Sequence, residues 1–230
     1  MSDYLNQFLF GYYPYICVSV FGVGCMIRYD KDQYSWKAGS SQILSDHWFR
    51  FANNMFHIGL LLLLCGHLFG LLTPESIYHK FISVEHKQLT AMIAGGIFGS
   101  ICFVGLTILV FRRLFNERVR AVSSFSDTMI VILLYIQLIL GLISISVSAQ
   151  HLDGSSMVAL ANWAQHIVTL RDGAANFVKP ENIIFKLHIT LGLTIFLLFP
   201  FSRLVHVLSA PVKYLFRPGY QIVRSRSARK

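Results

Sequence analysis

Charged residues are scarce in this sequence. Asp, Glu, Lys and Arg together make up 13% of the 230 residues, about half of the roughly 25% that is usual in soluble domains. Hydrophobic residues make up 54%, and the mean hydropathy is +0.56. This shortage of charge excludes an ordinary soluble domain and indicates a chain that lies largely within lipid. The length is that of one domain, and the sequence has no internal repeat or low-complexity segment.

Cysteine motifs are also lacking. The four cysteines lie singly inside apolar segments, at Cys17, Cys25, Cys65 and Cys102. None forms the C-x-x-C pair of a zinc or dithiol site or the C-x-x-C-H motif of covalent haem attachment. We therefore interpret all four as small hydrophobic side chains buried in the membrane.

Five apolar segments are each long enough to cross a hydrocarbon core, which takes about 20 helical residues. We expect membrane-spanning helices at about 5–27, 50–72, 89–111, 127–148 and 184–208. The first is neither preceded by Lys or Arg nor followed by a small-residue cleavage site, so a cleaved signal peptide is not expected. The predicted fold is an all-α membrane protein with five transmembrane helices in a single domain over residues 1–230.

Basic residues are concentrated on one side of this arrangement. Segments 28–49, 112–126 and 209–230 contain 3, 4 and 6 Lys and Arg residues, whereas the N-terminus, 73–88 and 149–183 contain 0, 2 and 2. Because basic loops stay in the cytoplasm, we expect the N-terminus outside, in the periplasm, and the C-terminus inside. The net charge of +9 then reflects topology, and nucleic-acid binding is not expected. The basic tail at 209–230 either binds a partner or anionic lipid or only fixes the topology.

Four histidines lie inside the expected spans, where ionisable groups usually have a function. They are His57 and His67 in the second span and His188 and His206 in the fifth. The two spans run in opposite directions, so His57 pairs with His206 near the inner face. His67 likewise pairs with His188 near the outer face. Each pair can provide two axial imidazoles to one haem iron, which leaves no open position and favours electron transfer. Zinc is the competing metal, but it usually takes further Cys or carboxylate ligands.

The spacing of these histidines constrains the two helices. His57 and His67 are separated by about 15 Å along a helix, and His188 and His206 by about 27 Å. The unequal distances require the helices to cross or bend, and in a continuous helix His188 and His206 would share one face. Arg203, one turn from His206, either pairs with a haem propionate or extends its charge toward the interface.

Six stretches of the sequence carry a recognisable pattern. They are YYPYICVSVFGVGCMIRYDKDQYSWKAGSSQ, NMFHIGLLLLLCGHLFGLLTPE, VEHKQLTAMIAGG, RRLFNERVRA, SAQHLDGSSM and KLHITLGLTIFLLFPFSRLVHV. This pattern closely resembles the gamma subunit, the membrane cytochrome b subunit, of respiratory nitrate reductases. The resemblance covers nearly the whole chain, and the last stretch, with two histidines 18 residues apart around LLFPFSRLVH, is highly specific.

The resemblance implies a subunit that holds two haem b groups and oxidises quinol, either ubiquinol or menaquinol, near the outer face. Residues matching His67 and His188 hold the outer haem in that family, and those matching His57 and His206 hold the inner one. Electrons would pass inward to the iron–sulphur clusters of a cytoplasmic beta subunit, and a molybdenum-containing alpha subunit would reduce nitrate. The implied location is the bacterial inner membrane, where turnover would contribute to the proton motive force.

The same resemblance implies a quinol site formed by Gly66, His67 and Lys87. Gly66 would leave space for the quinol ring. The second ring N–H of His67 would donate to a quinol oxygen, and Lys87 would contact the other side of the headgroup. For Lys87 the alternative is a lysine that only anchors its helix at the interface.

Other titratable side chains lie outside these sites. Glu85, His86 and His79 are near the outer edge and either carry protons released from quinol or are solvated bystanders. The remaining loop histidines, His47, His151 and His166, are assigned no function.

Two other interpretations stay open. A cytochrome b with the same haems can serve a hydrogenase, a formate dehydrogenase or a thiol–disulfide reductase instead. A carrier or channel with polar histidines is the non-redox alternative, although the sequence shows neither the inverted repeats nor the broken midplane helices expected of a carrier.

Overall fold

The computed structural model describes residues 2–36, 41, 44, 48–150 and 152–209. These residues form helices, turns and loops without a strand, and five of the helical segments are long and apolar enough to cross a membrane. The five spans are Asp3–Lys31, Trp48–Leu72, Val84–Phe115, Phe125–Ser148 and Ile183–Phe201. The five-helix architecture predicted from the sequence is therefore confirmed. The predicted basic tail lies, apart from Ser209, outside the described residues.

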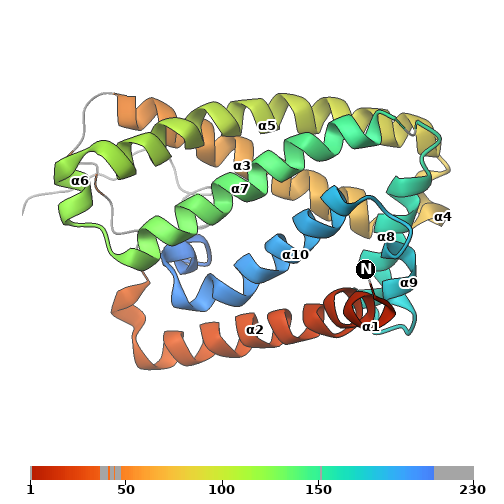
Figure 1. Cartoon of the computed structure of the whole chain (residues 1–230), viewed down its shortest axis with the longest axis horizontal. Coiled ribbons are helices and arrows are strands. Elements are labelled where there is room, and N and C mark those ends of the chain that lie inside the picture. The colour runs from red at the N-terminus through yellow and green to blue at the C-terminus, as the bar shows by residue number, and fades with distance from the viewer. Residues whose placement is uncertain (1, 37–40, 42–43, 45–47, 151, 210–230) are drawn as a thin grey trace, which may run out of the picture.

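The spans alternate in direction along an elongated bundle (Figure 1). The first span comprises α1 (Asp3–Gln7), a π-helical turn η1 (Phe8–Tyr12) and α2 (Tyr13–Lys31), and the others are α3 (Trp48–Leu72), α5 (Val84–Phe115), α7 (Phe125–Ser148) and α10 (Ile183–Leu198). Short helices lie at the two ends of the bundle. One end, which we call the α8 end, holds α4 (Glu75–Tyr78), α8 (Ser155–Val168) and α9 (Ala174–Val178). The other, the α6 end, holds α6 (Glu117–Ala121).

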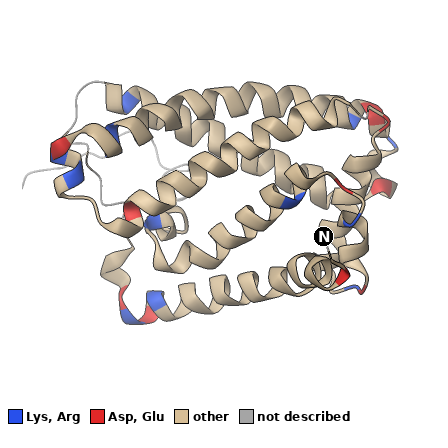
Figure 2. Cartoon of the chain, in the orientation of Figure 1, with Lys and Arg blue, Asp and Glu red and all other residues tan. Residues whose placement is uncertain are grey.

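Charged residues gather at these ends and are few in the middle of the described bundle (Figure 2), as an apolar surrounding requires.

The fifth span is broken near its end. The prediction of one helix over 184–208 is wrong, because α10 ends at Leu198. Two 3-10 turns follow, η4 (Phe199–Phe201) and η5 (Arg203–Val207). Pro200 has no N–H for the helical ladder and restricts the residue before it. Ser202, between the turns, is extended, with φ −117° and ψ 177°.

This break changes the spacing of the two histidines in the fifth span. The ten residues from His188 to Leu198 rise about 15 Å, as do the ten from His57 to His67. His206 lies on η5, beyond the break. The unequal spacing required the two helices to cross or bend, and the fifth span does bend at this break. His188 and His206 therefore do not share a helical face.

The third span begins earlier than predicted. α5 starts at Val84 rather than near residue 89, and Ser83 is its N-cap residue. The Ser83 hydroxyl accepts a hydrogen bond from the backbone N–H of His86 at 3.4 Å. Lys87 therefore lies at the start of this helix, as expected.

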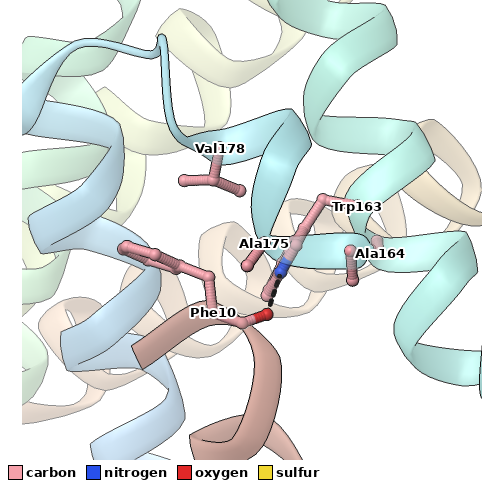
Figure 3. Packing of buried hydrophobic residues seen from close by; sticks show 6 residues of the cluster. Phe10, Trp163, Ala164, Ala175 and Val178 are labelled. Carbon is pink, nitrogen blue, oxygen red and sulfur yellow. Dashed lines mark hydrogen bonds between the residues drawn. The ribbon is translucent and has the colours of Figure 1, made fainter. Parts of the chain in front are cut away.

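The segment 149–183, expected to be a polar loop, contains the two helices α8 and α9. Trp163 on α8 donates its indole N–H to the Phe10 carbonyl at 2.9 Å. The side chains of Trp163 and Phe10 form a buried cluster with Ala164, Ala175 and Val178 (Figure 3). α8 and α9 thus close the α8 end of the bundle against the beginning of the first span.

Two glycines bring α3 and α5 into backbone contact. A Cβ atom built on Gly59 would lie 2.8 Å from the backbone nitrogen of Cys102. One built on Gly105 would lie 2.6 Å from both the Ala52 carbonyl oxygen and the Phe56 backbone nitrogen. Small residues at helix contacts are characteristic of membrane bundles, because they let backbones approach closely. Since α3 carries both histidines of the second span, this contact also fixes their position.

Gly105→Ala is expected to lower the free energy of unfolding by about 1–3 kcal/mol, the usual effect of overpacking, because the new Cβ would meet backbone atoms of α3. Gly96→Ala on the same helix is the matched control: beyond its own helical turn, its Cβ would meet no described atom within 4 Å. Denaturation of the detergent-solubilised protein, followed by circular dichroism, measures the difference. Equal stability of the two variants would contradict the close packing of α3 on α5.

Candidate functional site

His57 and His206 meet toward the α6 end of the bundle. His57 lies in the first half of α3, and His206 lies on η5 after the break. Their ring centroids are 6.4 Å apart, and the ring planes are inclined by 68°. The structure therefore brings together the two histidines that were expected at the inner depth.

His67 and His188 meet toward the α8 end. His67 lies near the end of α3, and His188 lies in the first half of α10. Their ring centroids are 6.0 Å apart, and the planes are inclined by 30°. The second pair therefore also occurs, and the two pairs are separated along the bundle.

Both separations suit a metal ion held between two imidazoles. Histidine–metal bonds are about 2 Å long and a ring nitrogen lies about 1 Å from the ring centroid, so two rings on opposite sides of one ion have centroids about 6 Å apart. Within the described part of the chain, no group of three or more His, Cys, Asp and Glu side chains lies together. Each pair thus offers two ligands, the number that a bis-histidine haem iron takes from the protein.

Three of the four rings are held by the same kind of hydrogen bond. The Nδ1 atom of His57 lies 2.8 Å from the Asn53 carbonyl, that of His67 lies 2.7 Å from the Leu63 carbonyl, and that of His206 contacts the Arg203 carbonyl. A carbonyl only accepts, so Nδ1 is the donor in each of these bonds and Nε2 is the nitrogen left to bind a metal. Without quinol, the second ring nitrogen of His67 is bonded to the Leu63 carbonyl, and its expected contact with a quinol oxygen stays a prediction.

His188 has a different surrounding. Its Nε2 lies 3.3 Å from the amide nitrogen of Gln137, which also donates to the His188 carbonyl at 3.0 Å. Among the described residues, the buried Nδ1 of His188 and the Oε1 of Gln137 have no hydrogen-bond partner. A Cβ on Gly141 would lie 3.0 Å from His188 Cε1, so the ring lies directly on the α7 backbone. Unsatisfied buried polar atoms are unfavourable, and their presence fits a site that a further group completes.

Gln137 and Gly141 were not identified from the sequence. Gln137 stands in the apolar stretch IVILLYIQLILGLI, and a lone amide within a membrane span is a usable signal of function. Gly141 gives no such signal, because only the position of α10 explains it.

Arg203 shares a carboxylate with Arg113 at the α6 end. The Arg203 Nε and Arg113 Nη1 atoms lie 3.6 and 4.0 Å from the oxygens of Asp127. Arg113 also donates to the Ser123 hydroxyl at 2.8 Å. Both guanidinium groups lie at the end of the bundle that also holds His206. Because arginine is the preferred partner of acidic groups, the two arginines are candidate contacts for such a group here.

Lys87 contacts an aromatic ring at the α8 end. Its Nζ atom is buried and lies 3.7 Å from the ring centroid of Tyr78. In the part of the chain that the structure describes, this Nζ has no hydrogen-bond partner. Burial, with a smaller contribution from Glu75, raises the pKa of the Tyr78 phenol, so the ring stays neutral and its face attracts the ammonium group. A Cβ on Gly66 would meet no described atom within 4 Å beyond its own helical turn, which leaves open space beside His67.

The other titratable residues of the α8 end have local, exposed contacts. His79 is 2.9 Å from Glu75 on α4, and the Nδ1 of His86 is 2.8 Å from the Ser83 hydroxyl. Glu85 is exposed in the first turn of α5. His47 and His151 lie outside the described residues.

Comparison with known proteins shows which family this chain resembles. Residues 6–226 match the family model described as nitrate reductase gamma subunit. Respiratory nitrate reductase 1 gamma chain of Escherichia coli (strain K12) is 50% identical over 224 residues, covering 97% of this chain and 99% of that protein. Respiratory nitrate reductase 2 gamma chain of the same organism is 51% identical over 226 residues, with 98% and 100% covered. The nitrate reductase gamma chain of Bacillus subtilis (strain 168) is 36% identical over 223 residues, with 96% and 99% covered.

The fold and the paired histidines define a multi-pass membrane protein with two candidate metal centres, one toward each end of the bundle. The chain belongs to the nitrate reductase gamma subunit family. It is accordingly a protein of the bacterial inner membrane. The resemblance inferred from the six sequence stretches is confirmed.

Proposed function

We propose that this chain is the di-haem cytochrome b membrane subunit of a respiratory nitrate reductase. It oxidises quinol near the periplasmic face and passes electrons inward to an iron–sulphur beta subunit, and a molybdenum-containing alpha subunit then reduces nitrate. Support comes from relatives named as gamma chains of respiratory nitrate reductases. In this proposal the α8 end faces the periplasm, and the α6 end faces the cytoplasm and both partner subunits.

The observation that carries the proposal is the pairing of the histidines at two depths. His57 and His206 would hold the inner haem, with ring centroids 6.4 Å apart. His67 and His188 would hold the outer one, with centroids 6.0 Å apart. Bound haem b would supply a one-electron carrier at each depth. With two protein ligands available to each iron, electron transfer would be favoured over oxygen binding.

Residues around the histidines prepare them for this role. Backbone carbonyls accept from Nδ1–H in three of the rings, which fixes each ring and leaves its Nε2 as the nitrogen that would bind the iron. Gln137 anchors α10 at His188 from α7 by donating to the His188 carbonyl. Arg203 and Arg113, with one carboxylate between them, would neutralise propionates of the inner haem.

We assign quinol oxidation to the α8 end, around Gly66, His67 and Lys87. The open space at Gly66 would admit the quinol ring, which is common to ubiquinol and menaquinol. The Lys87 ammonium group, supported by the Tyr78 ring at 3.7 Å, would donate to a quinol oxygen. Protons released there would leave on the periplasmic side. Inward transfer of each electron works against about 2.3 kcal/mol per 100 mV, so turnover contributes to the proton motive force.

Purified with its partners, the protein is expected to contain two haem b groups per chain, both six-coordinate and low-spin. The pyridine haemochrome assay measures their number, and reduced-minus-oxidised spectra measure their type. A single haem per chain, or a high-spin form that readily binds carbon monoxide, would contradict the paired ligands. Co-purification with hydrogenase or formate dehydrogenase subunits would instead support one of the alternative clients.

A further inference from the structure

One face of α2 lies against the break that follows α10. Phe21, Gly24 and Arg28 are spaced three and four residues apart, so they share this face. The Phe21 ring packs edge-on against Phe196 and Phe199, with centroid separations of 5.7 and 4.9 Å. α2 therefore follows α10 to its last turn and continues beside the break.

Gly24 is the point where the proline of the break meets α2. A Cβ atom built on Gly24 would lie 2.7 Å from Cγ and 2.9 Å from Cβ of Pro200. The pyrrolidine ring thus rests on bare helix backbone, and any larger residue at this position would displace it.

Arg28 holds the backbone of the break. Its Nη1 donates to the Pro200 carbonyl at 2.6 Å and to the Ser202 carbonyl at 2.8 Å. On its other side, Nε and Nη2 donate to the hydroxyl and carbonyl of Ser35 at 2.9 and 3.2 Å. Carbonyls at the end of a helix have no partner within that helix. A planar guanidinium group can bind several of them in one fixed arrangement, which an ammonium group cannot do.

The orientation of His206 follows from this contact. Ser202 is 3% exposed, and its hydroxyl accepts from the Leu204 N–H at 3.2 Å, which starts η5. His206 is on this same turn, and its Nδ1 donates to the Arg203 carbonyl. A shift of Ser202 would therefore turn η5 and, with it, the imidazole that faces His57.

We infer that Arg28, with Phe21 and Gly24, is a positioning residue for the inner haem. It fixes the break after α10 and thereby the ring of His206. This inference rests on the proposed function, since it requires a haem between His57 and His206. A competing role for Arg28 is to keep its end of α2 in the cytoplasm by charge alone, which lysine would do equally well.

Arg28→Lys tests the inference because it keeps the positive charge and removes the planar guanidinium group. In the complex with its partner subunits, the low-spin electron paramagnetic resonance signal of the inner haem is expected to shift, together with its midpoint potential. The signal and potential of the outer haem should stay unchanged and serve as an internal reference. Arg118→Gln is the charge control: it removes a positive charge from an exposed position on α6 at the same end, and neither haem should respond.

Gly24→Ala tests the same surface without changing any charge. Its new Cβ would press on Pro200, so the inner haem signal should shift as it does in Arg28→Lys. Gly22→Ala is the matched control on α2, because its Cβ would meet no described atom within 4 Å beyond its own helical turn. Gly24→Ala and Gly22→Ala together test the inference even if the Arg28 variant fails to assemble.

Three results would overturn the inference. The first is an inner haem in Arg28→Lys whose signal and midpoint potential equal those of the wild type, which would leave charge as the only role of Arg28. The second is an equal change at both haems, which would indicate general destabilisation. The third is identical behaviour of Gly24→Ala and Gly22→Ala. Failure of the proposed function is distinguishable, since the unmodified complex would then lack the inner haem altogether.

Discussion

Replacing His57 or His206 with alanine is expected to remove the inner haem and leave the outer one, so that the haem content falls from two to one per chain. The reason is that these two rings face each other at 6.4 Å, and each would supply one of only two protein ligands to that iron. The pyridine haemochrome assay gives the stoichiometry. The low-spin electron paramagnetic resonance signals identify which haem remains.

The reciprocal variants, His67→Ala and His188→Ala, are expected to remove the outer haem alone. Loss of either haem should reduce quinol-driven nitrate reduction to background, because the chain of carriers is interrupted. Dyes that donate electrons directly to the cytoplasmic subunits should still support nitrate reduction. His166→Ala is the control, since His166 lies on α8 against the Phe177 ring and belongs to neither pair. Loss of the same haem in His57→Ala and His188→Ala would refute the pairing.

The five spans and the histidine pairs could be predicted because the membrane imposes simple rules. A helix needs about 20 apolar residues to cross the bilayer, so hydropathy alone locates all five spans, although not the ends of the third and fifth. Alternating direction then assigns a depth to every residue in a span. Depth was sufficient to pair His57 with His206 and His67 with His188, without any knowledge of which helices are neighbours.

The break after α10 could not be predicted in the same way. Pro200 is visible in the sequence, but membrane helices tolerate proline, since neighbouring groups can satisfy the freed backbone atoms. Whether the helix continues or stops depends on those neighbours. Here the neighbour is Arg28, which bonds the Pro200 and Ser202 carbonyls from a distant part of the chain. Sequence patterns within one segment do not predict a contact with a distant segment.

The helices α8 and α9 were missed for a related reason. The segment is more polar than the spans, and a polar segment between spans is normally a loop. α8 is stable because its apolar side covers the beginning of the first span, with Trp163 bonded to the Phe10 carbonyl at 2.9 Å. The amphipathic pattern of α8 was one available signal for this helix. Gly154 and Gly173, both with positive φ, were another, since they directly precede the two helices.

Lys87→Ala is expected to weaken the binding of quinol and of quinol-site inhibitors by about 10- to 100-fold. Hydrogen bonds to charged groups contribute about 1.5–3 kcal/mol, and each 1.4 kcal/mol corresponds to a factor of about ten in affinity. Both haems should remain, because Lys87 is not a ligand. Inhibitor titration, followed through the spectrum of the outer haem, measures the affinity, and quinol-driven turnover measures the effect on catalysis.

Lys80→Ala and two variants of Tyr78 are the controls for this experiment. Lys80 is an exposed lysine between α4 and α5, at the same end of the bundle, so its removal matches the change in charge and should leave inhibitor affinity unchanged. Tyr78→Phe keeps the ring beneath the Lys87 ammonium group, whereas Tyr78→Leu removes it. A cation–π contact contributes about 0.5–2 kcal/mol, so only the leucine variant should weaken binding, and by less than Lys87→Ala.

The side on which protons appear decides between this site and one near the α6 end. If quinol is oxidised beside Gly66, His67 and Lys87, its protons leave on the periplasmic side while electrons move inward. Turnover should then slow as the membrane potential rises, because each charge works against about 2.3 kcal/mol per 100 mV. Vesicles of known orientation with a trapped pH indicator measure the side of release, and an uncoupler should restore the rate. Cytoplasmic proton release, or normal quinol oxidation by Lys87→Ala, would require the site to be moved to the α6 end, where the inner haem would have to accept electrons directly.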